Sequence, residues 1–306
     1  MARKTPKITV MGLYGASIFM GVERFPKKGE TVISREYLTE PGGKGYNQAV
    51  ALARLGAAVC FITAVGDDTF GKLCEDYLKA EGITDHFIKQ CSKPTASASI
   101  IYDSQGTSRV IVFPGASQSL TCDDILKARS SIAQSEFLLL QNELPPETLY
   151  AAVDLARELG VRVILNPAPA GEFDPHIFQQ VYVLTPNEGE AAALAGMEVG
   201  ASPVELAGRI HSLGARRVII TLGERGVLMS DGGRITWIEA VPVRAVDTTG
   251  AGDTFNGALT FALARGFELR AAARYAVVAS GLAVTRRGVM AAIPYRDDVD
   301  LLYNQL

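Results

Sequence analysis

A glycine-rich stretch near residue 250 places an acidic side chain beside backbone that can hold an anion. The segment reads Val246-Asp-Thr-Thr-Gly-Ala-Gly-Asp253 and opens a helical pattern. At a helix start, free N–H groups and the helix dipole attract negative charge, so Gly250, Ala251 and Gly252 are expected to form an anion hole. Asp253 could then accept a hydroxyl proton, which is the pairing that phosphoryl transfer to a hydroxyl requires. The alternative is that Asp253 is an ordinary first-turn residue.

A second glycine cluster combines close backbone approach with a cation. Pro41–Ala49 reads PGGKGYNQA and runs directly into a helical pattern. Gly42, Gly43 and Gly45 let backbone come near a ligand, Lys44 supplies a positive charge, and the helix start adds amide donors. We interpret this segment as a loop that approaches a ligand. An ordinary glycine-rich loop with a solvent-facing lysine is the alternative.

A near match to a nucleotide-binding P-loop occurs at residues 66–73, and we reject it. The sequence is Gly66-Asp-Asp-Thr-Phe-Gly-Lys-Leu73. Leu73 lacks the hydroxyl that such a loop uses for Mg²⁺, and Asp67 and Asp68 would repel phosphates. The segment is more typical of a strand, a turn, and a helix from Thr69 capped by one of these aspartates.

The composition excludes several other classes of protein. Of the 306 residues, 48% are hydrophobic and 21% are charged, with a formal net charge of −3. This near balance argues against nucleic acid as a partner. No apolar run approaches the roughly 18 residues of a membrane span, and the N-terminus lacks a signal-peptide core. The four cysteines are thinly spread and are expected to be reduced and buried, which favours a cytoplasmic location, and the three histidines match no zinc spacing.

Short β-rich apolar runs alternate with amphipathic helical patterns along most of the chain. This alternation predicts an α/β fold with a mainly parallel sheet and helices on both faces. The expected strands are Ile8–Met11, Val59–Ala64, Phe137–Leu140, Val161–Leu165, Val181–Leu184 and Val218–Leu222. The expected helices are Gly45–Leu55, Thr69–Ala80, Pro146–Leu159, Asn187–Ala195 and Pro203–Leu213.

Two segments interrupt this alternation. Gly29–Glu40 and Thr95–Phe113 carry β patterns without helices between them, and the second includes an expected hairpin around Asp103–Gly106. Such strands suggest a small sheet beside the main one that could act as a lid. No repeat or linker divides the chain. We therefore expect a single domain over residues 1–306, with lid segments at about 13–41 and 94–114.

Five motifs follow one another along the chain. They are Gly42–Gly45 with Asn47-Gln-Ala, Asn166–Pro169, Thr185–Glu188, Thr221–Gly226 and Asp247–Asp253. Together they resemble the ribokinase family, the PfkB carbohydrate kinases, over almost the whole chain. The resemblance implies a three-layer α/β/α sandwich with a small β-sheet lid. It also implies an enzyme that uses ATP and Mg²⁺ and transfers the γ-phosphoryl group to a sugar hydroxyl.

The resemblance assigns roles to the residues for chemistry and nucleotide binding. Asp253 matches the general base on the acceptor hydroxyl, and the expected anion hole matches the site of the transferring phosphate. Asn187 and Glu190 match an Asn-x-x-Glu motif that positions phosphates and Mg²⁺, the metal through water; alternatively, Asn187 only caps a helix. The implied nucleotide-binding loop contains Thr221, Gly223 and Gly226.

The resemblance also implies a monovalent cation site for K⁺. Asp247 and the carbonyl of Thr249 match positions that hold the ion in the family, as do later carbonyls at Ala283, Arg286 and Gly288. Ala292 stands where the family has a serine ligand, so one oxygen of the site is missing. The alternative for Asp247 is that it closes a turn.

The residues on the sugar side depart from the family pattern. The family reads Gly-Ser-x-Asn-x-Asp where this chain reads Gly12-Leu-Tyr-Gly-Ala-Ser17, so Gly15 and Ser17 replace the side chains that hydrogen-bond ribose. A pocket that pairs with a hydroxyl rejects analogues lacking it, so this change predicts an acceptor other than ribose. The implied substrate site comprises Gly15, Ser17, Gly42, Gly43, Lys44, Gly45, Tyr46, Asn47, Glu143 and Asp253.

Tyr46 replaces a small residue of the family and is expected to offer an aromatic face to the acceptor. The expected acceptor therefore has fewer hydroxyls than ribose or carries an apolar face. Two alternatives are a nucleoside kinase of the same fold, with Tyr46 stacked on a base, and a catalytically idle sugar-binding sensor. The intact Asp253, Asn187 and Glu190 argue against the sensor. Free edges of the lid strands predict a homodimer through the lid.

Overall fold

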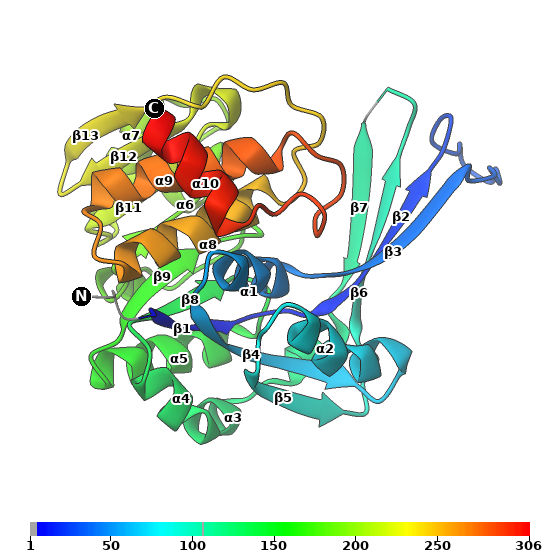
Figure 1. The fold of residues 1–306 in the computed structure, drawn as a ribbon, viewed down its shortest axis with the longest axis horizontal. Helices are drawn as coiled ribbons and strands as arrows, with labels where there is room; N and C mark the ends of the chain where they lie inside the picture. Colours follow the sequence, from blue (N-terminus) through cyan, green and yellow to red (C-terminus); the bar gives the residue numbers. More distant parts are fainter. Residues whose placement is uncertain (1–4, 106) are drawn as a thin grey trace.

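A large twisted sheet forms the centre of the molecule, and a small sheet stands to one side of it (Figure 1). The computed structural model describes residues 5–105 and 107–306. The strand order in the large sheet is β13-β12-β11-β10-β9-β8-β1-β4-β5. Pairing is parallel from β5 to β11 and antiparallel for β12 and β13. The bounds are β1 Lys7–Met11, β4 Ala58–Gly66, β5 Asp85–Cys91, β8 Phe137–Gln141, β9 Arg162–Asn166, β10 Val183–Leu184, β11 Arg217–Thr221, β12 Val227–Asp231 and β13 Arg234–Ile238.

The central strands are apolar on both faces because helices cover both. On β8, Phe137 and Leu139 point into one hydrophobic cluster, while Leu138 and Leu140 point into the other. The first cluster lies under α1 Lys44–Arg54, α2 Thr69–Ala80, α8 Ala251–Ala264, α9 Leu269–Ala283 and α10 Arg296–Gln305. The second lies under α3 Cys122–Lys127, α4 Arg129–Ala133, α5 Pro146–Glu158, α6 Glu188–Ala195 and α7 Pro203–Ser212. The predicted three-layer α/β/α sandwich is confirmed.

The small sheet contains four strands in the order β3-β2-β6-β7. They are β2 Gly15–Gly21, β3 Glu36–Gly42, β6 Ala96–Tyr102 and β7 Ser108–Phe113. The central pair β2–β6 is parallel and the outer pairs are antiparallel. The β6–β7 hairpin is confirmed, although Gly106 in its expected turn lies outside the described residues. The Asp103 side chain closes this turn by accepting from the N–H groups of Gln105 and Thr107, both at 3.0 Å.

Some predicted boundaries are wrong. The β pattern assigned to Gly29–Glu40 yields a strand only from Glu36, and the partner strand β2 begins earlier, at Gly15. Small residues open β2, so its apolar periodicity is weak in sequence. Strand β10 is also shorter than expected: it consists of Val183 and Leu184, which both pair with β9, while Leu184 alone pairs with β11.

The rejected P-loop is a strand–turn–helix. Asp68 caps α2 by accepting from the backbone N–H of Gly71 at 2.8 Å, and it also accepts from the N–H and hydroxyl of Thr95, where β6 approaches. All four cysteines are free, but only Cys60 and Cys74 are buried; Cys122 is exposed because it opens a surface helix. Among the described helices, none has the length and apolarity to cross a membrane. The cytoplasmic location stays a prediction.

Candidate active site

Three connected cavities run along the carboxyl edge of the large sheet. The lid cavity, of about 790 Å³, lies between the small sheet and the main body. It shares Lys44, Gly250 and Asp253 with a central cavity of about 220 Å³. The central cavity in turn shares Thr221, Thr248 and Gly252 with an outer cavity of about 530 Å³. Two ligands in the end cavities could therefore meet in the central one, at Asp253.

Asp253 lies in the first turn of α8, and residues of α1 orient its carboxylate. Asn47 Nδ2 donates to Asp253 Oδ2 at 2.8 Å, and Gln48 Nε2 donates to Asp253 Oδ1 at 3.0 Å. The two helices approach closely because Gly257 has no side chain: a Cβ there would lie 2.6 Å from the Cβ of Ala51. Packing of α1 on α8 thus places the carboxylate, which is 7% exposed, between the lid and central cavities.

The start of α8 has the geometry of an anion hole. Gly250 caps the helix with φ 78°, a left-handed conformation that favours glycine. A Cβ on Gly250 would also lie 2.9 Å from Val289 Cγ1, so both the backbone conformation and the lack of space disfavour a larger residue. Ala251 and Gly252 lie in the first helical turn; the Ala251 N–H donates to the Thr248 carbonyl at 3.2 Å, whereas the Gly252 N–H has no earlier helical carbonyl to pair with. Gly250 and Gly252 both line the central cavity.

Lys44 and Glu143 are in contact in the wall of the lid cavity. The backbone N–H of Lys44 donates to Glu143 Oε2 at 2.9 Å. The negative charge of Asp253 is the main cause that raises the pKa of the Lys44 amine, so the side chain stays a cation. Burial raises the pKa of Glu143 to about 7, against the opposing positive charge of Lys44. Glu143 can therefore change charge near neutral pH.

The glycines around Lys44 let this segment pack closely against other parts of the chain, in addition to any approach to a ligand. Gly43 has φ 102°, and a Cβ there would lie 2.4 Å from the Leu13 carbonyl oxygen. A Cβ on Gly45 would lie 2.6 Å from the Cα of Gly12. Likewise, a Cβ on Gly42 would overlap the Ser17 hydroxyl. Close packing against the β1–β2 connection thus places Lys44 at the cavity wall.

Asn187 and Glu190 form a reciprocal cap on α6. Asn187 Oδ1 accepts from the N–H of Glu190 at 2.8 Å, and Glu190 Oε2 accepts from the N–H of Asn187 at 2.9 Å. The capping role is therefore real, and both residues also line the central cavity. Burial is the main cause that raises the pKa of Glu190. Glu190 Oε1 takes no part in the cap.

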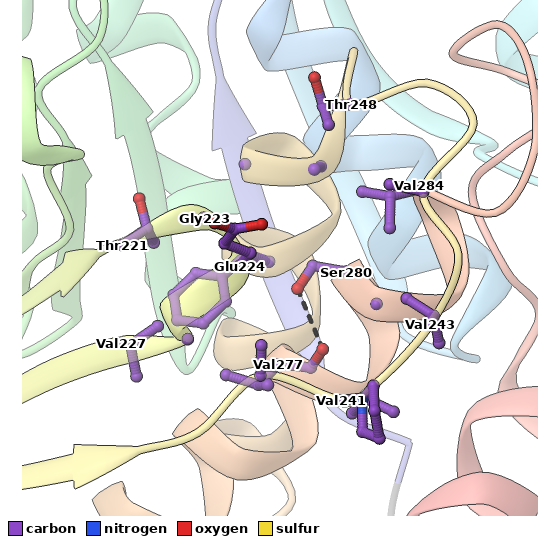
Figure 2. A pocket seen from close by; sticks show the side chains of 18 residues that line it. Thr221, Gly223, Glu224, Val227, Val241, Val243, Thr248, Val277, Ser280 and Val284 are labelled. Carbon is purple, nitrogen blue, oxygen red and sulfur yellow. Dashed lines mark hydrogen bonds between the residues drawn. The ribbon is translucent and has the colours of Figure 1, made fainter.

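The outer cavity is a mostly apolar slot, and its polar side chains are those of Thr221, Glu224, Thr248 and Ser280 (Figure 2). The predicted loop residues Thr221, Gly223 and Gly226 all line it. Gly226 has φ 84°, and a Cβ there would lie 2.1 Å from the Ile238 carbonyl oxygen. Sequence reasoning found these three positions but missed the apolar walls. Those residues come from separate segments with no common motif: Val227, Val241, Val243, Val277 and Val284.

Asp247 ties the loop before α8 to the loop after α9. Its Oδ1 accepts from the N–H of Thr249 at 2.9 Å and its Oδ2 from the N–H of Gly288 at 3.1 Å. The positions Ala283 and Arg286 lie at the end of α9 and just beyond it, in the same neighbourhood. Ala292 is buried and offers no side-chain oxygen. Within residues 5–105 and 107–306, no cluster of three or more His, Cys, Asp or Glu side chains could hold a metal ion.

A carboxylate that sequence reasoning missed lies beside this loop. Glu40 Oε2, on lid strand β3, is buried and has no hydrogen-bond partner among the described residues. A Cβ on Gly288 would lie 3.4 Å from Glu40 Oε1. Nothing in the local sequence marks Glu40, because β3 reaches the loop only through the tertiary fold.

The sugar-side replacements line the lid cavity. Gly15 and Ser17 both belong to its wall, together with apolar side chains of the small sheet: Phe19, Ile100, Val110 and Val112. A Cβ on Gly15 would lie 2.4 Å from the Ala96 carbonyl oxygen, so β6 leaves no room for a side chain there. The lid therefore offers a mostly apolar surface to whatever occupies the cavity.

The expectation that Tyr46 contacts the substrate is wrong. Its side chain is 1% exposed and belongs to the hydrophobic core between α1 and the sheet. Its ring meets Tyr14 edge-on at 5.4 Å between centroids and Phe61 at 6.3 Å. The periodicity of α1 turns this position toward the sheet, while Lys44 and Asn47 line the lid cavity.

Comparisons with known proteins agree with this architecture. Residues 7–296 match the pfkB family carbohydrate kinase model. The ribokinase of Haemophilus influenzae is 38% identical over 299 residues, covering 97% of both chains. The ribokinase structure from Giardia lamblia superposes with a TM-score of 0.92 at 27% identity, covering 99% of each chain. The Arabidopsis thaliana ribokinase, solved with ribose and ATP, gives 0.87 at 29% identity, covering 98% of this chain and 99% of that one. The chain belongs to the pfkB family of carbohydrate kinases and is a sugar kinase, a phosphotransferase with an alcohol group as acceptor.

Proposed function

We propose that this kinase transfers the γ-phosphoryl group of ATP to a hydroxyl of a sugar bound in the lid cavity, with Asp253 as the general base. The observation that carries the proposal is the position of Asp253 at the junction of two cavities, beside the start of α8. A hydroxyl in the lid cavity would give its proton to Asp253, while the α8 amides would stabilise charge on the transferred group.

ATP fits the remaining two cavities. The apolar slot of the outer cavity suits a planar base, and Thr221 and Gly252 lead from it into the central cavity. There Lys44, Asn187 and Glu190 surround the space for the phosphates. Mg²⁺ would be held by the phosphates and, through water, by Glu190, whose Oε1 lies outside the α6 cap. The ion would neutralise charge on the phosphates.

K⁺ fits the loop pair joined by Asp247. We propose that the carbonyls of Thr249, Ala283, Arg286 and Gly288 hold it with Asp247. The buried oxygen of Glu40, which lacks a partner among the described residues, supports a cation near Gly288. A carboxylate there could supply the oxygen that Ala292 does not. When bound, the ion would add positive charge near the anion hole.

The acceptor is proposed to have a polar edge and an apolar face. Lys44, Asn47, Glu143 and Asp253 provide the polar side of the lid cavity, opposite the apolar lid wall. Asn47 Oδ1 is buried without a partner among the described residues, so it can accept from a substrate hydroxyl. Loss of the charge-assisted bonds of the family's carboxylate, roughly 1.5–3 kcal/mol each, disfavours ribose relative to a sugar with fewer hydroxyls.

ADP release across pentoses, hexoses, deoxysugars and nucleosides tests the acceptor. Deoxysugars are expected to give the highest kcat/KM. Clear preference for D-ribose at micromolar KM would overturn the altered specificity, and binding without turnover on every acceptor would favour a sensor. A nucleoside acceptor has lost its main support, since Tyr46 is in the core.

Replacement of the base tests the chemistry. Asp253→Asn should lower kcat by about 10²–10⁴-fold while ATP binding persists, because general base catalysis contributes about that much. Asp253 does not line the outer cavity, so the affinity for ADP measured by calorimetry is the control. Turnover close to that of the wild type would remove Asp253 from its assigned role.

We also propose that residues 13–41 and 94–114 close over the acceptor and mediate a homodimer. Apolar side chains are exposed on the small sheet, including Tyr37 and Ile111 at 69% each and Phe113 at 49%. Exposed apolar side chains on the two free edge strands favour a partner. Light scattering should report a dimer for the wild type and a monomer for Ile111→Lys. A monomeric wild type would refute the assembly.

A further inference from the structure

A chain of buried amides connects Asp253 to the interior of the large sheet. Gln48 Nε2 donates to Asp253 Oδ1 at 3.0 Å and to Asn166 Oδ1 at 3.1 Å. Gln141 Nε2 donates to Gln48 Oε1 at 2.7 Å. Gln48 and Gln141 are fully buried. Gln141 and Asn166 end the neighbouring parallel strands β8 and β9 and stand in register.

The direction of each amide follows from its neighbours. The Thr185 carbonyl can only accept, so Asn166 must present Nδ2 to it, at 3.0 Å, and Oδ1 to Gln48. Gln48 must then present Nε2 to Asn166 and Asp253, which leaves its Oε1 for the Gln141 amine. A flipped Gln48 would set its oxygen against two acceptors. The backbone of the sheet therefore sets the donor that faces Asp253.

A second branch holds the start of α8. The Thr185 hydroxyl donates to Asn256 Oδ1 at 2.6 Å, and Asn256 Nδ2 donates to the Gly252 carbonyl at 2.9 Å. Thr185 and Asn256 are 1% and 2% exposed. The same network thus fixes the Asp253 side chain and the helical turn that carries it.

We propose that Gln48 is a positioning residue for Asp253, with its own orientation set by Asn166 and Gln141. This inference rests on the proposed role of Asp253 as general base. Gln48 holds Oδ1 on the buried side, whereas Oδ2 accepts from Asn47, which lines the lid cavity. Because the bond from Gln48 fixes Oδ1 from the buried side, the carboxylate cannot rotate about its bond to Asn47, and Oδ2 stays aimed at the acceptor hydroxyl.

Three charged groups face Asp253 from the surrounding elements: Lys44 on α1, Glu143 after β8 and Glu190 on α6. Substitution of Gln48 leaves all three in place. A fall in kcat without a change in either KM therefore reports the bond from Gln48 separately from general loss of stability.

Gln48→Met tests the proposal, because methionine has nearly the same length and no donor. We expect kcat to fall about 10–100-fold with little change in either KM, since misplacement of a reacting group acts on the chemical step. Gln48→Glu, which sets an acceptor against Asp253, should lower kcat further.

Thr148→Val is the matched control. The buried Thr148 hydroxyl donates to the Leu120 carbonyl at 2.8 Å, and neither residue lines the three cavities, so this variant loses a buried hydrogen bond outside the site. Its melting temperature should fall while its kcat and both KM values stay those of the wild type. A folded Gln48→Met enzyme with unchanged kcat would overturn the positioning role.

The experiments can refute the two proposals independently of each other. If Asp253→Asn keeps its turnover, the base assignment fails; if it loses turnover while Gln48→Met does not, only the positioning role fails. Should Gln48→Met not fold, Gln141→Met removes just the bond that orients Gln48. That variant should show a smaller fall in kcat in the same direction, and an unchanged kcat would count against the proposal.

Discussion

Glu143 is expected to make acceptor binding depend on pH near neutrality. Burial raises the pKa of its carboxyl to about 7, so about a tenth of the groups are ionised at pH 6 and about nine-tenths at pH 8. The ionised form accepts hydrogen bonds from sugar hydroxyls more strongly than the neutral form, by about 1 kcal/mol. Acceptor KM should therefore rise as the pH falls through 7.

Two quantities limit the size of this change in acceptor KM. The change in ionised fraction allows at most about a tenfold effect between pH 8 and pH 6, and 1 kcal/mol corresponds to about fivefold. Because the ionised fraction falls only from about nine-tenths to about a tenth, the two effects together predict that acceptor KM rises about three- to fourfold. ADP release at saturating ATP measures it. The KM for ATP should not change with pH in this way, because Glu143 lines the lid cavity but neither the central nor the outer cavity.

Glu143→Gln provides the control, because glutamine does not titrate. Its acceptor KM should be high and the same from pH 6 to pH 8. A constant acceptor KM in the wild type, or a pH dependence that survives in Glu143→Gln, would refute the reasoning. The raised pKa also makes stability depend on pH. The folded state holds the Glu143 proton more tightly than the unfolded chain does. The contribution of this proton to the free energy of unfolding is therefore present at acid pH and is lost as the pH rises through about 7.

Three further predictions concern packing and backbone. Tyr46→Ala should lower the free energy of unfolding by about 3–5 kcal/mol in denaturant titrations, because it empties a core position, with acceptor KM unchanged. Gly226→Ala should weaken ADP binding in calorimetry, since its Cβ would lie 2.1 Å from a carbonyl oxygen; Gly232→Ala, also at positive φ but with open space, should not. Asp68→Ala should reduce stability by about 1–2 kcal/mol through loss of the α2 cap, whereas Asp67→Ala removes only an exposed ion pair with a small effect. Equal melting temperatures for the two aspartate variants would contradict the capping argument.

Local patterns predicted most of the central sheet. Strands such as Phe137–Gln141 are apolar on both faces, and this is a distinctive signature of buried parallel strands. The Asp68 cap was also predictable, because it depends on neighbours within one turn. Strand β2 was not, since small residues such as Gly15 and Ser17 carry little periodicity.

The site was predictable where a motif is contiguous and not where it depends on packing. Gly250–Asp253 lies at a helix start as expected. Tyr46 was misassigned because the sequence shows that a residue differs from the family, not which way it faces. Gln48 was overlooked for a related reason: a glutamine on a helix resembles a surface residue until the sheet is seen to surround it.

The sequence by itself determined which chemical groups are available: a carboxylate at a helix start, a lysine among glycines, and a sugar side without its usual carboxylate. Those features depend on side-chain type and on short spacings. Only the tertiary structure decided that Asn47 and Asp253, 206 residues apart, share a hydrogen bond, and that β3 brings Glu40 to Gly288. The physical reason is that such contacts arise when whole elements pack, α1 on α8 and the small sheet on the large body, and no local pattern encodes that packing.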